Sequence, residues 1–176
     1  MANGKRAHIL VVEDKASERA ALARLLRLEN YEVETAASAS EALPFLQEPI
    51  DMVISDLKMS KTSGMDLLRY WKDRRPRTPF VMVTAYGDVH SAVKAMKLGA
   101  ADYLNKPVNP DEVLLLIERC IETSRKDRTI QELQARLDER LGFDQVVGHS
   151  KAMLDVFDHA RRAALTDSTV CITGES

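Results

Sequence analysis

Five short apolar runs, separated by segments with helical spacing, constrain the fold of this chain more than any other feature. A continuous apolar run of about four to eight residues is typical of a strand buried on both faces, as in a parallel sheet. Segments whose apolar residues recur every three or four positions are typical of helices packed on one side. The alternation predicts an α/β layer fold with a parallel sheet and right-handed crossover connections. The predicted strands lie at 9–12, 31–35, 51–56, 80–83 and 101–104.

Local signals place the ends of several intervening helices. Ser38 followed by Glu41 is a capping box and predicts the start of the second helix. Pro44 follows closely; it would be tolerated in the first turn but would kink the helix further in. Gly99 is a natural end for the fourth helix, and Asn109, followed by proline and two acids, predicts the start of the fifth.

Polar residues follow four of the predicted strands. Glu13 and Asp14 come after the first, Asp56 ends the third, Thr84 ends the fourth, and the fifth ends near Lys106. The carboxyl ends of parallel strands meet at one edge of a sheet, where α/β proteins bind their ligands. Three carboxylates in one place repel each other, so the pattern favours a site for Mg2+, which prefers oxygen ligands. With a hydroxyl and an ammonium nearby, this site suits an aspartyl phosphate, although each residue alone would be interpreted as a cap or a solvated charge.

Composition narrows the class of protein. The chain has 176 residues, enough for one ordinary domain and a remainder. Its formal charge of −2 provides no electrostatic case for nucleic-acid binding by the chain as a whole. Cys120 and Cys171 form no CxxC motif, which indicates a reduced cytoplasmic setting. The apolar run at 9–12 is too short for a signal peptide or a membrane span, so no membrane partner is expected.

Four stretches around these strand ends resemble the response-regulator receiver domains of two-component signalling. They are Ile-Leu-Val-Val-Glu-Asp at 9–14, Val-Ile-Ser-Asp-Leu-Lys-Met at 53–59, Val-Met-Val-Thr-Ala-Tyr-Gly at 81–87 and Gly-Ala-Ala-Asp-Tyr-Leu-Asn-Lys-Pro at 99–107. The resemblance covers residues 7–123 and implies a flavodoxin-like (CheY-like), doubly wound sheet of five parallel strands in the order 2-1-3-4-5, followed by a helical linker.

The same resemblance implies roles for the polar residues. Asp56 would accept a phosphoryl group from a sensor histidine kinase. Thr84 and Tyr103 would form a switch pair, and Lys106 would bind the phosphoryl group and precede a cis bond to proline. Ser60 departs from the family, which usually has proline there. The implied Mg2+ ligands are three carboxylates and one backbone carbonyl, from Glu13, Asp14, Asp56 and Lys58.

Residues 124–142 are predicted to form a helical linker. Ile130, Leu133, Leu137 and Leu141 are spaced like the stripe of a short coiled coil. We favour a linker that forms a homodimer together with a face of the receiver, and the alternative is a helix folded back on its own receiver. Phosphorylation would then change the shape of that face and switch the oligomeric state.

Residues 143–176 resemble the beginning of the AAA+ ATPase domain of NtrC-type activators, which act on sigma-54 RNA polymerase. A helix at 151–164 and a strand at 169–173 lead into Gly174, Glu175 and Ser176, the start of a nucleotide loop that lacks its lysine. The chain as given is therefore not expected to be an enzyme, whereas the full-length protein is expected to be an ATPase that engages the polymerase and DNA.

Two other functions remain open. One is a stand-alone receiver that acts through contacts with other proteins. The other is a phosphohydrolase with an aspartyl-phosphate intermediate, similar to the haloacid-dehalogenase phosphatases. Those enzymes need an acid two residues after the nucleophile, where this chain has Lys58. This difference argues against a phosphohydrolase.

Overall fold

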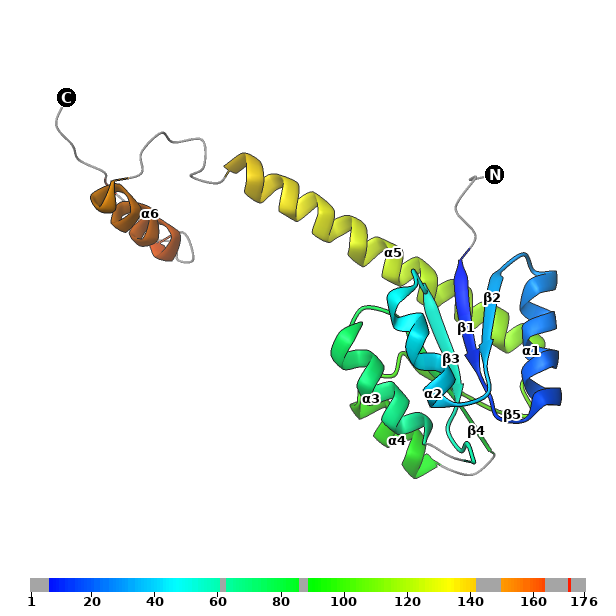
Figure 1. Cartoon of the computed structure of the whole chain (residues 1–176). Coiled ribbons are helices and arrows are strands. Elements are labelled where there is room, and N and C mark those ends of the chain that lie inside the picture. The colour runs from blue at the N-terminus through cyan, green and yellow to red at the C-terminus, as the bar shows by residue number, and fades with distance from the viewer. Residues whose placement is uncertain (1–6, 61–62, 86–88, 142–149, 164–170, 172–176) are drawn as a thin grey trace. The chain divides into compact units, whose positions relative to one another are not determined.

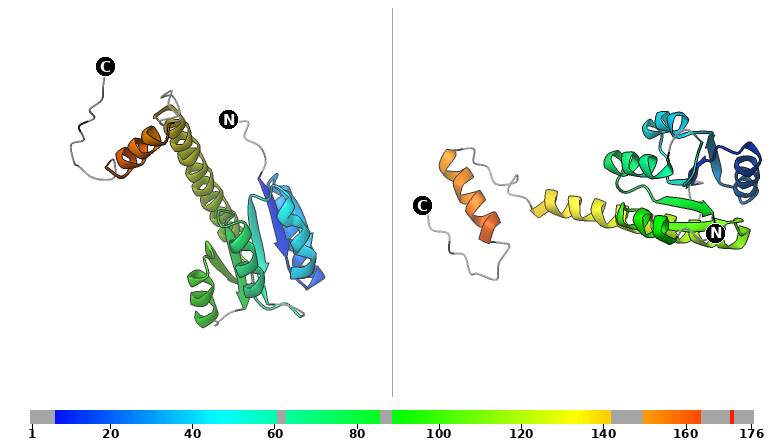
Figure 2. Two further views of the ribbon diagram at one scale, coloured as in Figure 1. Left: turned by 60° about the vertical axis from the view of Figure 1, so that its left-hand side comes forward. Right: turned by 90° about the horizontal axis from the view of Figure 1, so that it is seen from below.

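A computed structural model describes residues 7–60, 63–85, 89–141, 150–163 and 171. Its centre is a parallel sheet of five strands in the order β2-β1-β3-β4-β5, which confirms the predicted fold and strand order. The elements can be followed in Figure 1, and Figure 2 shows them from two other sides. The strands are β1 (His8–Val12), β2 (Glu32–Ala36), β3 (Met52–Asp56), β4 (Phe80–Ala85) and β5 (Asp102–Lys106).

Helices connect each strand to the next and continue after β5. The described helices are α1 (Ala16–Leu28), α2 (Ala39–Ala42), the 3-10 helix η1 (Leu43–Gln47), α3 (Gly64–Arg74), α4 (Val89–Lys97), α5 (Pro110–Leu141) and α6 (Lys151–Ala163). None of them combines the length and the apolar composition that crossing a membrane requires.

The sheet separates two apolar cores, because successive side chains of a strand point to opposite faces. In β1, Leu10 and Val12 pack with α2, η1, α3 and α4, whereas Ile9 and Val11 pack with α1 and α5. β3 and β4 alternate in the same way. Every residue of β3 is buried, as expected for the central strand of a parallel sheet covered on both faces.

The second helix differs from its prediction. Ser38 caps it as expected, since its hydroxyl accepts a hydrogen bond from the Glu41 backbone N–H at 3.2 Å. The α-helix then ends at Ala42, after one turn, and the chain continues as η1 with Pro44 in its first turn. Proline has no N–H to donate within an α-helix but is tolerated where a new helix begins.

Each strand also differs from its prediction by one or two residues at one end or both. β1 begins one residue earlier, β3 begins one residue later and β4 ends two residues later. β2 occupies 32–36 rather than 31–35, and β5 occupies 102–106 rather than 101–104. Lys106 is the last residue of β5, in agreement with a fifth strand that ends near Lys106, and its peptide bond to Pro107 is cis, as the resemblance implied. Gly99 ends α4 with φ +91°, a conformation that favours glycine.

The chain divides into two compact units, Met1–Arg128 and Thr129–Ser176. The predicted linker has no helix of its own, because α5 runs without a break from Pro110 to Leu141. In the second unit α6 matches the predicted helix to within one residue. Most of the predicted strand at 169–173 lies outside the described residues. The boundaries of the receiver, linker and ATPase fragment at 123 and 142 remain predictions.

Candidate functional site

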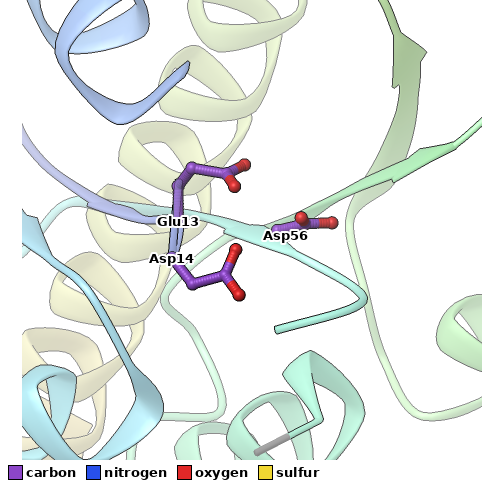
Figure 3. Close-up of side chains that lie close together, drawn as sticks. All are labelled: Glu13, Asp14 and Asp56. Carbon is purple, nitrogen blue, oxygen red and sulfur yellow. The ribbon is translucent and has the colours of Figure 1, made fainter. Parts of the chain in front are cut away.

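Three carboxylates lie together at the C-terminal edge of the sheet. β1 and β3 are neighbours in the sheet, and Val12 of β1 pairs with Ser55 of β3. Glu13 and Asp56, which directly follow these two residues, therefore lie at the same height along the sheet. Glu13, Asp14 and Asp56 each contribute an oxygen, and these oxygens all lie within 4.8 Å of one another. Figure 3 shows Glu13 and Asp14 leaving the end of β1 on opposite sides, with Asp56 opposite them at the end of β3.

Lys106 brings a positive charge to this cluster from the end of β5. Its Nζ atom lies 2.7 Å from Glu13 Oε2 and 2.7 Å from Asp56 Oδ2. A third carboxylate, Glu18 Oε2 in α1, is also 2.7 Å from Nζ. An ammonium has three N–H donors, so these three carboxylates can engage all of them. The structure thus brings together the acidic and basic residues that the sequence predicted at different strand ends.

The electrostatics of the site follow from these contacts. Burial acts to lower the pKa of Lys106, but hydrogen bonds to the carboxylates of Asp56, Glu13 and Glu18 outweigh it, and the pKa is raised. Burial raises the pKa of the Glu13 carboxyl, against the effect of its bond to Lys106. The Ser60 backbone N–H, 2.7 Å from Asp14 Oδ2, lowers the pKa of Asp14. Lys106 is therefore a permanently charged partner for Asp56 at neutral pH.

The loop after β3 holds Asp56 through the backbone. The Lys58 N–H donates to Asp56 Oδ1 at 3.2 Å, and the Gly64 N–H donates to the Leu57 carbonyl at 3.0 Å. Ser63 caps α3, since its hydroxyl accepts a hydrogen bond from the Met65 N–H at 3.2 Å. A Cβ atom at Gly64 would lie 2.1 Å from the Asp56 carbonyl oxygen. The first turn of α3 can approach the strand this closely only because residue 64 has no side chain.

The two predicted switch residues differ in exposure. Thr84 lies in β4 and is 2% exposed, whereas Tyr103 lies in β5 and is 39% exposed. In the register of these strands Thr84 pairs with Asn105, two residues beyond Tyr103. Thr84 is therefore inside the fold next to the site edge, and Tyr103 is on the surface of the neighbouring strand.

Sequence reasoning missed three residues that shape the site. Gly64 and Glu18 are two of them, and the third is Arg19, whose Nη1 donates to the backbone carbonyls of Glu13 at 2.5 Å and Asp14 at 3.3 Å. Arg19 and Glu18 occupy the first turns of α1, where an acid looks like an ordinary partner of the helix dipole. Their contacts could not be found from local pattern, because they depend on where α1 lies against β1 and β5.

A cavity of about 650 Å³ lies between α1, the sheet and the segment after β5. Its lining is mostly apolar, and five charged residues also border it: Glu13, Lys15, Glu18, Asp56 and Lys106. On its α1 side it is lined by Ala21, Leu22 and Leu25. The site therefore borders open space on this side rather than a closely packed wall.

For the other predicted site residues, the structure does not test the predicted roles. Gly174, Glu175 and Ser176, the predicted start of a nucleotide loop, lie outside the described residues. The backbone carbonyl of Lys58 stays a predicted Mg2+ ligand.

Sequence comparison places the chain among known proteins. Residues 9–118 match the response regulator receiver domain family. The chain is 34% identical over 176 residues to the alginate biosynthesis transcriptional regulatory protein AlgB of Pseudomonas putida, covering 99% of this chain and 39% of that protein. It is 31% identical over 169 residues to the regulatory protein AtoC of Escherichia coli K12, covering 96% of this chain and 37% of that protein. It thus spans about two fifths of the length of these curated relatives.

Solved structures agree with this placement. NtrX from Brucella abortus is similar with a TM-score of 0.71 and 32% identity, over 91% of this chain and 35% of that chain. A receiver domain protein from Clostridium thermocellum has a TM-score of 0.65 and 38% identity, over 68% of this chain and 97% of that chain. AlgB, AtoC and NtrX are regulators of the NtrC type, and the chain described here belongs to the response-regulator receiver domain family.

Proposed function

We propose that Asp56 accepts a phosphoryl group from a phosphorylated histidine of a sensor kinase, in the cytoplasm and with Mg2+ as cofactor. The observation that carries this proposal is the contact of 2.7 Å between Lys106 Nζ and Asp56 Oδ2 at the C-terminal edge of the sheet. A fixed ammonium beside a nucleophilic carboxylate suits the transfer of a group that carries negative charge.

The chemistry needs little beyond positioning and charge. A carboxylate oxygen of Asp56 forms a bond to phosphorus while the bond from phosphorus to the imidazole nitrogen breaks, and the kinase histidine leaves. Lys106 can exchange its contact with the Asp56 carboxylate for a contact with the phosphoryl oxygens, because its Nζ already lies beside the acceptor. The Lys58 N–H on the other Asp56 oxygen keeps the carboxylate oriented.

The acidic cluster fits a hard divalent cation. Glu13, Asp14 and Asp56 supply oxygens only, and three carboxylates with a single lysine among them leave an excess of negative charge. Mg2+ bound to these residues and to the Lys58 carbonyl would neutralise that excess and the charge of the incoming phosphoryl group.

Substitution of the acceptor tests the proposal. Asp56→Ala is expected to abolish phosphorylation by a cognate kinase or by acetyl phosphate, with the fold retained in thermal unfolding. Asp73→Asn is the matched control, because Asp73 is an exposed acid on α3, with its side chain 77% exposed. Stoichiometric labelling of the Asp56→Ala variant would refute the assignment.

The phosphorylated state would be recognised on the face formed by α4, β5 and α5. Thr84 would move toward the new phosphoryl oxygens, and the space it leaves would let Tyr103 turn inward. This face carries exposed apolar side chains, at Val93, Met96, Tyr103 and Leu115. Burying them against a second copy would make the oligomeric state depend on phosphorylation.

The linker would contribute to the same dimer. Ile130 and Leu133 are about half exposed on α5, at 52% and 53%, as expected for a stripe that pairs with another helix. Leu137 and Leu141, which complete the stripe, have side chains outside those described. Sedimentation with and without Mg2+ and beryllofluoride tests this: the wild type is expected to shift toward a dimer, and an Ile130→Asp, Leu133→Asp variant to shift less. Identical behaviour of both proteins would refute the role of the stripe.

The wider function rests on relatives that are longer than this chain. A receiver followed by an ATPase that acts on sigma-54 RNA polymerase at DNA agrees with the similarity to AlgB and AtoC, which extends beyond residues 9–118 to almost the whole chain. A stand-alone receiver acting through protein contacts is the second candidate, favoured by the exposed face on α4, β5 and α5. The coding sequence after Ser176 distinguishes them: an open frame that continues into Gly-Thr-Gly-Lys supports the activator, and a stop codon supports the stand-alone receiver.

A further inference from the structure

We propose that Glu18 is a positioning residue that holds Lys106 beside Asp56 during phosphoryl transfer. The inference rests on the proposed function. Lys106 has three carboxylate partners, all at 2.7 Å, and only one of them lies outside the acidic cluster. In the proposed reaction Glu13 is a cation ligand and Asp56 is the phosphoacceptor, so each of them binds another group during transfer. Glu18 is the partner that can keep its bond to Lys106 throughout.

Packing against neighbouring residues does not by itself hold the Lys106 side chain in one rotamer. Its side chain is 18% exposed and lines the cavity between α1 and the segment after β5. A long, flexible side chain beside open space has several rotamers available, and holding it in one of them costs conformational entropy. Its position is therefore fixed chiefly by the ion pairs at its end. When Glu13 binds the cation and Asp56 binds the phosphoryl group, the ion pair with Glu18 still holds the ammonium of Lys106.

Glu18 is itself well anchored. Its Oε1 accepts a hydrogen bond from Lys15 Nζ at 2.7 Å, and its Oε2 is the atom that contacts Lys106. It lies in the first turn of α1, where the helix dipole favours an acid. Bonds from Lys106 and Lys15 lower the pKa of Glu18, so that it is charged at neutral pH. Lys15 also offsets the negative charge that Glu18 would otherwise present to an anionic phosphodonor.

The distances around Lys106 Nζ also indicate whether Glu18 favours or opposes phosphoryl transfer. If Glu18 drew Lys106 away from the site, the distance from Nζ to Asp56 would be long while the distance to Glu18 was short. Both distances are 2.7 Å, so the contact with Glu18 is compatible with the contact that matters for transfer. Loss of the Glu18 charge is therefore expected to slow phosphorylation and not to accelerate it.

A double-mutant cycle separates this role from a general structural one. The initial rate of phosphorylation by acetyl phosphate with Mg2+ is measured by intact-mass spectrometry for wild type, Glu18→Gln, Lys106→Ala and the double variant. Glu18→Gln is expected to slow the wild type about fivefold, the upper range for a partly exposed ion pair. In the Lys106→Ala background the same substitution is expected to change the rate by less than about 1.5-fold, because the group that it positions is gone.

A second readout needs neither Mg2+ nor a phosphodonor. In urea, Glu18→Gln is expected to lower the unfolding midpoint of the wild type. In the Lys106→Ala background it is expected to leave the midpoint unchanged or raise it, because an unpaired carboxylate near Glu13 and Asp56 is repelled by them. Glu29→Gln, which removes an exposed acid at the other end of α1, is the matched control. It is expected to leave the rate unchanged and not to lower the midpoint, because an acid at a helix C-terminus opposes the dipole.

Each outcome decides the matter. An equal loss of rate on Glu18→Gln in both backgrounds, or a faster reaction of the single variant, overturns the positioning role while leaving Asp56 as acceptor. Wild-type protein that is labelled neither by acetyl phosphate nor by a cognate kinase overturns the proposed function and, with it, this inference.

Discussion

Gly64 is the position at which one added methyl group tests the geometry of the site most directly. It begins α3, beside the last residue of β3. In a Gly64→Ala variant the new Cβ would lie 2.1 Å from the Asp56 carbonyl oxygen, 3.0 Å from its carbonyl carbon and 3.1 Å from Leu57 Cα. All three atoms are backbone, so no side-chain rotation can relieve the contact.

The cost can be estimated from these distances. The Cβ would be about 1.3 Å closer to the oxygen than the 3.4 Å at which ordinary contact begins, so the start of α3 or the end of β3 must move. Overpacking of this kind costs about 1–3 kcal/mol, and a rigid backbone partner places the cost near the upper end. With a urea slope of about 2 kcal/mol per molar, the unfolding midpoint falls by about 1–1.5 M. Displacement of Asp56 from Lys106 is also expected to slow phosphorylation.

Urea unfolding followed by a phosphorylation assay checks both effects. Gly99→Ala is the matched control: its Cβ would meet nothing closer than 3.8 Å, so its cost of about 1 kcal/mol comes only from the backbone at φ +91°. It is expected to be phosphorylated at the wild-type rate. If Gly64→Ala unfolds no more easily than Gly99→Ala and is phosphorylated normally, the reasoning about the loop is wrong.

Two further predictions concern titration and reactivity. The hydrogen bond from the Ser60 N–H lowers the pKa of Asp14, so the stability it contributes is complete above about pH 4 and is lost as the pH falls through the lower folded value. In Mg2+-free buffer the Ser60 amide chemical shift should therefore titrate with a midpoint below 3.8; a midpoint at or above that value contradicts the prediction. Cys171 is exposed, whereas Cys120 is buried and burial raises the pKa of its thiol. A thiol reagent at pH 8 should modify Cys171 first, and equal rates for the two thiols would contradict this.

The edge on which the site lies could be predicted from sequence for a simple physical reason. Buried parallel strands all end on the same side of their sheet, so Asp56, Glu13 and Lys106 had to share that edge once three strands were identified. Which strands are neighbours is not contained in any local pattern, and only the family resemblance supplied the order. The pairing of Val12 with Ser55 then makes Glu13 and Asp56 neighbours.

The contacts that refine the site could not be predicted in this way. Glu18 looks like an acid that stabilises the start of a helix, and its partner Lys106 is far away in the sequence. Gly64 looks like a loop residue, because the close approach of α3 to β3 depends on how the helix packs on the sheet. The break of the second helix at Pro44 was only partly foreseeable, since a proline there permits either a kink or a new helix.

The burial of Trp71 has a practical consequence for experiments on this chain. It is the only tryptophan in the sequence, it is 1% exposed, and its ring meets Phe80 edge to face with centroids 6.4 Å apart. Its Nε1 has no hydrogen-bond partner among the described residues, so the indole is in an apolar environment. Intrinsic fluorescence therefore reports on the core between the sheet and α2, η1, α3 and α4.

Among the described residues, the opposite core, beneath α1 and α5, has no tryptophan and only a partly buried tyrosine, Tyr31. Tryptophan fluorescence therefore reports on only one of the two faces of the sheet. Loosening of α5 could escape a fluorescence measurement that detects any change around α3. A tryptophan introduced at Leu116, on the α5 side, would make both faces visible in one emission spectrum.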